Sequence, residues 1–207
     1  MKRLFAVSVI AALVACADMR IPGMGGGWET LIDGDKGLEN FDRVGDANWR
    51  AEGGMIVADK GKSGFLLTKK SYRDFEIRAE FWAEADTNSG IYLRCNSREK
   101  ISGSKGGTCY EVNIWDTRPD PKYGTGAIVD VAAVPVPIAN KAGGHWNTYE
   151  ITAKGSQFTV RLNGMPTVSG EDATFAEGSI GLQYALGGAN GTQGGPIKWR
   201  KVEIRPL

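Results

Sequence analysis

The chain has 207 residues, with 25 Lys and Arg, 24 Asp and Glu and a formal net charge of +1. A charge so close to balance gives no electrostatic support for binding nucleic acid or a broad membrane surface. The length allows one domain with a sizeable hydrophobic core.

Residues 1–15 are predicted to be a secretory signal peptide. A positive start, Met1-Lys2-Arg3, precedes an apolar run from Leu4 to Val14 that is too short to span a bilayer as a mature helix. Removing residues 1–15 lowers the number of Lys and Arg from 25 to 23 against 24 acids, which gives a net charge of −1.

The segment Leu13-Val14-Ala15-Cys16 resembles the bacterial lipoprotein cleavage motif. Cys16 is therefore expected to become the acylated first residue, and Ala17 after it favours the outer membrane. The mature chain is expected at that membrane, in the periplasm or at the cell surface. Ordinary signal-peptidase cleavage after Ala15-Cys16-Ala17 is the alternative.

Cys95 and Cys109 remain in the mature chain. They lie at matching ends of two adjacent predicted strands, and in an oxidising compartment such an even pair predicts a disulfide. The bond would fix residues 96–108, whose Gly- and Ser-rich composition cannot hold one shape by itself. A metal site on these cysteines is not expected, because CxxC spacing is absent and the one histidine is distant in sequence.

Residues 16–27 show neither helical nor strand periodicity and are expected to be a flexible tether, followed by one domain over residues 28–207. Short alternating runs recur between turn signals in this domain, which predicts an all-β sandwich. The clearest strand is Asp74–Glu84, and Leu162-Asn163-Gly164-Met165 predicts a hairpin turn. About a dozen expected strands favour a jelly roll of two curved antiparallel sheets over an immunoglobulin-like sandwich.

Two expected strands, Asn88–Cys95 and Thr108–Asp116, carry the candidate site. Their alternation places Ile91, Leu93, Tyr110, Val112 and Ile114 on the core face. It places Tyr92, Arg94, Glu111, Asn113 and Trp115 on the opposite face. This mixture of phenol, guanidinium, carboxylate, amide and indole suits a polyhydroxylated ligand, although cross-strand Arg–Glu pairs also occur simply as stabilising contacts.

Gln183 is expected to join the same face. Ile180 and Leu182 take the core side of their strand, which leaves Gly181 and Gln183 on the other side. Gly181 leaves space, and Gln183 offers both a donor and an acceptor to a ligand.

Seven stretches of the chain, in order, resemble the bacterial 3-keto-disaccharide hydrolase family. They are Leu31-Ile32-Asp33-Gly34, Asp74-Phe75-Glu76-Ile77-Arg78, Asn88-Ser89-Gly90-Ile91, Tyr110-Glu111-Val112-Asn113-Ile114-Trp115-Asp116, Trp146-Asn147-Thr148-Tyr149-Glu150-Ile151, Leu162-Asn163-Gly164 and Gly181-Leu182-Gln183. The resemblance covers about Trp28 to the C-terminus and implies a concanavalin A-like or LamG-like jelly roll.

The chain also departs from the pattern of that family. Asn113 stands where Gln is common, and Tyr184-Ala185 stand where an acid or Asn and then His often follow the glutamine. If that histidine takes part in catalysis elsewhere in the family, its absence bears on turnover here. His145 does not replace it in position and is expected to be a surface or turn residue.

The resemblance implies hydrolysis of glycosides that carry a ketone at C3 of the sugar. The ketone acidifies the C2 proton, so a base can remove it, the glycosidic oxygen at C1 can leave by elimination, and water can then add. Glu111 is the expected base, Arg94 is expected to hold the keto or enolate oxygen, and Asp116 is a second candidate acid or base. Asn88, Asn113 and Gln183 would orient hydroxyls, and Tyr92 or Trp115 would carry the sugar ring.

The expected partner is a carbohydrate, either a keto-sugar or an oligosaccharide, and a sugar 3-dehydrogenase would supply the ketone. A divalent cation is a possible replacement for Arg94, although no ligand spacing identifies its site. Two other functions stay open. One is a non-catalytic carbohydrate-binding module in which Glu111 merely accepts hydrogen bonds. The other is a protein-binding surface around Trp82, which is expected to be exposed at the opposite sheet edge.

Overall fold

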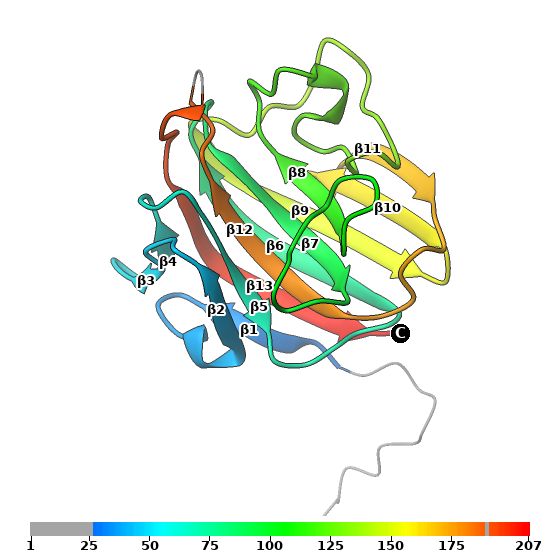
Figure 1. Ribbon diagram of the computed structural model, residues 1–207, viewed down its shortest axis with the longest axis horizontal. Helices are drawn as coiled ribbons and strands as arrows, with labels where there is room; N and C mark the ends of the chain where they lie inside the picture. The colour runs from blue at the N-terminus through cyan, green and yellow to red at the C-terminus, as the bar shows by residue number, and fades with distance from the viewer. Residues whose placement is uncertain (1–26, 189–190) are drawn as a thin grey trace, which may run out of the picture.

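Two antiparallel sheets lie face to face in the computed structural model, which describes residues 27–188 and 191–207 (Figure 1). The larger sheet contains β1 (Glu29–Asp33), β3 (Arg50–Ala51), β4 (Ile56–Ala58), β6 (Phe75–Ala83), β9 (His145–Lys154), β10 (Gln157–Leu162), β11 (Met165–Glu171) and β13 (Ile197–Pro206). The smaller sheet contains β2 (Phe41–Gly45), β5 (Ser63–Thr68), β7 (Asn88–Cys95), β8 (Tyr110–Ile114) and β12 (Ser179–Ala185). The predicted signal peptide, Cys16 and all but the last residue of the tether lie outside the described residues.

The strand order confirms the predicted jelly roll. The larger sheet runs β11-β10-β9-β6-β13-β4-β3, with β1 also paired to β13, and the smaller sheet runs β2-β5-β12-β7-β8. Two short 3-10 helices, η1 (Leu38–Asn40) and η2 (Pro121–Tyr123), lie in the connections. Among the described residues, no helix has the length and apolar character needed to cross a membrane.

Alternation along β6 explains how the larger sheet faces the core. Its buried residues are Phe75, Ile77, Ala79, Phe81 and Ala83, as the sequence predicts. Trp82, on the opposite face, lies within the larger sheet and not at its edge, because β6 pairs with both β9 and β13. The ring of Trp82 is half-buried under Lys198, whose Nζ is 4.3 Å from the ring centroid, so the expectation of an exposed edge tryptophan is wrong.

The predicted hairpin turn joins β10 to β11. Asn163 and Gly164 have φ angles of 52° and 78°, the positive values that a tight hairpin turn requires and that Asn and Gly adopt most readily. The position of this turn is therefore confirmed.

A β-bulge in β7 changes the direction of its last residues. Tyr92 is opposite Gly181, whereas Cys95 is opposite Ser179, so β7 contains one more residue than β12 over this interval. Arg94 lies inside the bulge with a φ of 53°. Because strand alternation fails across an extra residue, the side chains from Arg94 onward no longer follow the predicted faces, whereas Leu93 still lies in the core.

The smaller sheet ends at β8, and the chain itself covers this edge. Residues 126–129 supply backbone hydrogen bonds from Gly126 N to Asn113 O, from Asn113 N to Ala127 O and from Val129 N to Glu111 O. An uncovered edge would expose a row of unpaired backbone groups. The cover therefore protects the strand that carries Glu111.

Candidate active site

The face of the smaller sheet that points away from the core gathers the predicted polar residues in two adjacent rows. One row contains Gln183, Gly90 and Asn113, which lie opposite one another on β12, β7 and β8. The next row contains Gly181, Tyr92 and Glu111. Gly90 and Gly181 carry no side chains, so neighbouring groups can lie over them. A Cβ at Gly90 would be 3.3 Å from Glu111 Cγ, which shows that Glu111 occupies that space.

Tyr92 connects the other polar groups of this face. Gln183 Nε2 donates a hydrogen bond of 2.7 Å to the Tyr92 hydroxyl, and the hydroxyl in turn interacts with Glu111. Phe65 packs edge-on against the Tyr92 ring, with 5.0 Å between the ring centroids. These contacts hold the phenol in place beside the carboxyl group.

Two acceptor atoms of this face have no partner. Asn113 Nδ2 donates to Tyr123 O over 2.6 Å, but Asn113 Oδ1 has no hydrogen bond within the described residues, and neither has Gln183 Oε1. Both side chains are more than nine-tenths buried. Buried polar atoms are nearly always paired, so these two acceptors indicate a place for a ligand that brings hydroxyl donors.

Burial sets the protonation of Glu111. The side chain is 7% exposed, and burial raises its pKa to about 7, while the Tyr92 hydroxyl and the charge of Arg118 act in the opposite direction. Burial, together with the nearby Glu111, raises the pKa of Tyr92 well above its ordinary value, so the phenol stays protonated. The pair therefore offers a carboxylate that can take a proton near neutral pH and a hydroxyl that can donate a hydrogen bond.

Arg118 supplies a positive charge that the sequence did not predict for this site. Its charge lowers the pKa of both Glu111 and Tyr92, and its Cζ lies 5.7 Å from the centroid of the Trp115 ring. Arg118 belongs to the loop between β8 and β9, which has no strand periodicity. Its closeness in sequence to Trp115 and Asp116 is the signal that could have suggested it.

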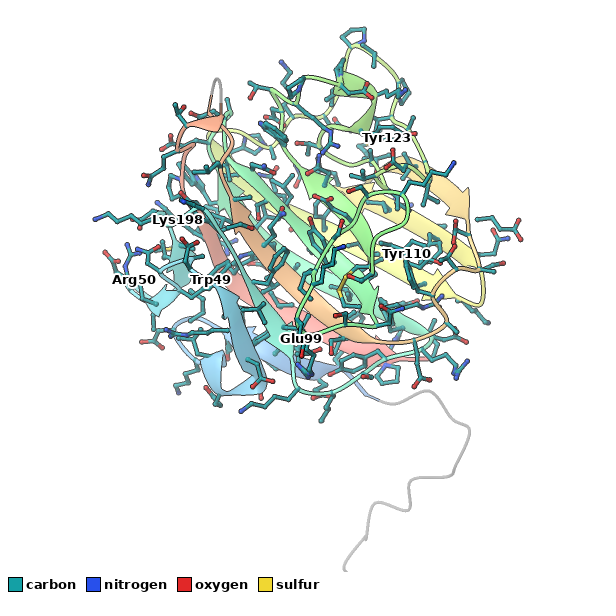
Figure 2. The ribbon with its side chains drawn as sticks, viewed as in Figure 1. Trp49, Arg50, Glu99, Tyr110, Tyr123 and Lys198 are labelled. Carbon is teal, nitrogen blue, oxygen red and sulfur yellow. A yellow bond between two sulfur atoms is a disulfide. The ribbon has the colours of Figure 1, made fainter. Side chains whose placement is uncertain are left out.

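The remaining predicted binding residues lie at the start of β7 and just beyond the end of β8. Asn88 is opposite Ala185, and its Nδ2 donates to Leu186 O over 2.8 Å. Trp115 directly follows β8, and its indole Nε1 is buried without a partner within the described residues. In Figure 2, Tyr123 lies above Tyr110, in the connection between β8 and β9.

Residues 27–205 match the family described as the 3-keto-alpha-glucoside-1,2-lyase-like domain. The chain belongs to this family. Membership indicates a carbohydrate-related function and an enzyme that acts on glycosides. No protein curated for function matches the chain by sequence.

Solved structures share the fold of this family member. A protein from Parabacteroides distasonis, provisionally described as a glycosyl hydrolase, is 25% identical, with a TM-score of 0.64 over 87% of this chain and 100% of that chain. A Bacillus subtilis protein of unknown function with a galectin-like fold is 9% identical, with a TM-score of 0.62 over 87% of this chain and 97% of that chain. The second similarity concerns the fold alone.

Arg94 does not belong to the face that carries Glu111, so the prediction that it lies there is wrong. The bulge sends its side chain to the end of the sandwich, where Nε donates to Arg73 O and Nη1 donates to Gly155 O, both over 2.7 Å. Nη2 donates to Asp74 Oδ1 over 3.2 Å. Arg94 is 1% exposed. It therefore links β7 to chain segments next to β6 and β9, which belong to the larger sheet.

Asp116 holds the loop between β8 and β9 in place. Its carboxylate accepts hydrogen bonds from Thr125 Oγ1 at 2.6 Å, from Ala142 N at 3.0 Å and from Gly143 N at 2.8 Å. Because the carboxylate already has these donors, a structural role accounts for Asp116.

The predicted disulfide between Cys95 and Cys109 is present. His145 is the exposed first residue of β9, in agreement with its predicted surface position. Among the described residues, no group of three or more His, Cys, Asp and Glu side chains is arranged to hold a metal ion.

The position of Arg94 leads to a stability prediction. Arg94→Met would leave the carbonyls of Arg73 and Gly155 and the Asp74 carboxylate without their guanidinium partner, so we expect the free energy of unfolding to fall by about 3 to 5 kcal/mol. Urea unfolding measures this change. Arg73→Met is the matched control, because Arg73 forms an exposed ion pair with Glu177 and its loss should cost about 1 kcal/mol or less. Equal effects of the two substitutions would contradict the role given to Arg94.

The raised pKa of Glu111 predicts a specific dependence of stability on pH. Folding raises the pKa from 4.5 to about 7, so the folded state binds this proton more tightly than the unfolded chain does. Protonation of Glu111 therefore contributes fully to the free energy of unfolding below the unfolded pKa. This contribution, about 3 kcal/mol, is lost as the pH rises through about 7. Glu111→Gln should remove this loss and Glu99→Gln, an exposed control, should keep it. Chemical unfolding across this pH range measures the difference, and an unchanged slope in Glu111→Gln would contradict the burial of an ionisable Glu111.

Proposed function

We propose that this protein hydrolyses 3-keto-glycosides by elimination and water addition. A base takes the proton from C2, the electron pair of the C2–H bond forms the C1–C2 double bond, and the C1–O bond breaks as the leaving oxygen takes up a proton. Water then adds at C1 of the unsaturated ketone. The sum of these steps is hydrolysis of the glycosidic bond, with no oxidant or reductant consumed.

The observation that carries this proposal is the carboxyl group of Glu111, which burial brings to a pKa of about 7. General bases work best when their pKa is near the operating pH. Glu111 is assigned as the base. The protonated Tyr92 hydroxyl is assigned as a hydrogen-bond donor to the developing enolate oxygen, and Arg118 as the charge that stabilises it. Arg118 thereby takes the role that the sequence suggested for Arg94.

Asn113 and Gln183 are assigned to the sugar hydroxyls. Their unpaired acceptor atoms, Oδ1 and Oε1, lie in one row on either side of Gly90. Hydroxyl groups of a sugar would supply the donors that these atoms lack. A sugar 3-dehydrogenase would supply the keto-glycoside.

We also propose that the protein is exported and anchored through an acylated Cys16. The Cys95–Cys109 disulfide supports export, because such bonds persist in oxidising compartments. A divalent cation that assists the enolate is the possible cofactor, and its addition to the assay below would reveal any dependence.

The decisive substitution is Glu111→Gln. It keeps the size and hydrogen bonding of the side chain but removes its ability to take a proton, so turnover of 3-keto-trehalose should fall by about 10² to 10⁴ while substrate binding changes little. Release of free glucose measures the rate, and Glu99→Gln, on the exposed loop after β7 (Figure 2), should retain the wild-type rate. Wild-type turnover in Glu111→Gln would refute the assigned base. Sugar binding without any turnover in the wild type would instead identify a carbohydrate-binding module.

The assignment of Arg118 makes a separate prediction. Arg118→Met should lower the rate by about 10² to 10³, the range for loss of one transition-state donor. Because the charge of Arg118 lowers the pKa of Glu111, the rise in rate with pH should also move to higher pH. Arg43→Met, an exposed substitution on β2, serves as the control for loss of one positive charge. A pH–rate profile that coincides with the wild type would contradict the assignment.

A further inference from the structure

The loop between β7 and β8 lies directly on the candidate base. A Cβ at Gly103 would be 2.3 Å from Glu111 Cβ, 2.7 Å from Glu111 Oε2 and 3.2 Å from Tyr92 Cε1. In Figure 1 this loop crosses in front of β7 and β8. A general base must come within about 2.6 to 3.2 Å of the group that it deprotonates. While Gly103 occupies this position, a substrate atom cannot reach Glu111 from the side of the loop.

The two ends of this loop and its tip are held in different ways. At the two ends, the disulfide joins Cys95 to Cys109, and Arg98 donates to Thr68 O over 2.8 Å and to Asp42 Oδ2 over 3.1 Å. The tip, Ser102–Gly107, is closed on itself by a hydrogen bond of 2.8 Å from Gly107 N to Ser104 O. The two ends of the loop are therefore fixed, and the tip is a small unit with its own shape.

Ser102 is held by the end of the loop, because its carbonyl accepts hydrogen bonds from Thr108 N over 2.9 Å and from Cys109 N over 3.1 Å. Among the described residues, one hydrogen bond ties the tip to the domain outside this loop. It runs from Lys105 N to Asp130 Oδ2 over 2.9 Å. The tip also packs on the sheet through Gly103, which has no side chain to anchor. Movement of residues 103–107 about Ser102 therefore requires loss of one polar contact outside the loop, while the disulfide and the hydrogen bonds of Ser102 keep the ends of the loop in place.

The tip also forms one wall of a cavity of about 390 Å³, within the size range of small-molecule sites. Tyr110 and Phe175 contribute aromatic surface to the cavity, and Asp130, Asp172 and Thr174 contribute polar groups. Aromatic surface beside hydrogen-bond acceptors suits a neutral sugar. The two carboxyl groups of the wall outnumber its one positive charge, Lys105, which disfavours an anionic ligand.

We propose that Ser102–Gly107 is a lid, held closed by the hydrogen bond to Asp130. When the lid lifts from Glu111, a neutral sugar can enter the space beside Glu111 and extend into this cavity. The inference rests on the proposed function, because the lid has to open only if Glu111 acts on a bound glycoside. To the proposed function it adds how the substrate enters and which hydrogen bond holds the lid closed. It also adds that the part of the substrate beyond the reacting ring is a neutral sugar.

The hydrogen bond that holds the lid closed can be tested at Asp130, whose φ of 59° is a conformation that Gly and Asn both tolerate. Asp130→Gly removes the acceptor, so amide hydrogen exchange over Ser102–Gly107 should be about tenfold faster, whereas Asp130→Asn keeps an acceptor and should stay within about twofold. Gly103→Ala, which pushes the tip from Glu111 without touching Asp130, should accelerate the same amides. The β9–β10 hairpin should exchange at the wild-type rate in all three proteins. Unchanged exchange of the tip in both Asp130→Gly and Gly103→Ala would overturn the lid.

The entry of a neutral sugar is tested by titrating the full domain with lactose and, separately, with glucose 6-phosphate. Lactose should shift the backbone amide resonances of the tip and of Thr174, and glucose 6-phosphate should leave them in place. Lactose shifts confined to other parts of the domain, or equal shifts with the anion, would overturn the cavity as a sugar site. The wild type could show the expected hydrogen exchange and lactose shifts but no turnover of 3-keto-trehalose. That result would refute the hydrolase proposal and would still support the lid.

Discussion

The register of β7 between β12 and β8 is the constraint on which the candidate site depends. It aligns Gln183 with Gly90 and Asn113, and Gly181 with Tyr92 and Glu111. A shift of β7 by one residue would turn Tyr92 into the core and remove the hydroxyl that lies between Gln183 and Glu111. The bulge then ends this alignment after Tyr92 and directs Arg94 to the larger sheet. One strand therefore arranges a polar face and also links the two sheets.

Burial gives Glu111 its chemical character and also restricts access to it. An exposed glutamate would be ionised at neutral pH and would be a weak base, whereas burial raises the pKa of Glu111 to about 7. Part of that burial comes from Gly103, a residue of the loop and not of the sheet. The same loop can therefore control both the basicity of Glu111 and the entry of a substrate.

Strand periodicity predicted much of this structure because alternation depends on local geometry. The core face of β6, the bounds of β7 and the Asn163-Gly164 turn all follow from residue spacing. Alternation placed Arg94 wrongly because a bulge adds one residue, and the sequence around Arg94 does not indicate it. Arg118 was missed for a different reason. It lies in a loop, where position is set by distant contacts such as the hydrogen bonds from Ala142 and Gly143 to Asp116.

The departures from the family pattern acquire a physical meaning once the register is known. Position 185 lies on the same face as Gln183 and opposite Asn88, so a histidine there would stand beside the candidate site. This chain has Ala185 at that position, while Tyr184 points into the core. An imidazole is thus missing from this corner of the face, and the proton transfers proposed here fall to Glu111 and the Tyr92 hydroxyl.

Asn113 is shorter than the glutamine common in the family, and its amide group is held by Tyr123 O in the covering loop, which leaves Oδ1 for a ligand. The chain therefore combines the family's sheet with a polar face of its own composition, in which a buried carboxyl group takes the central place.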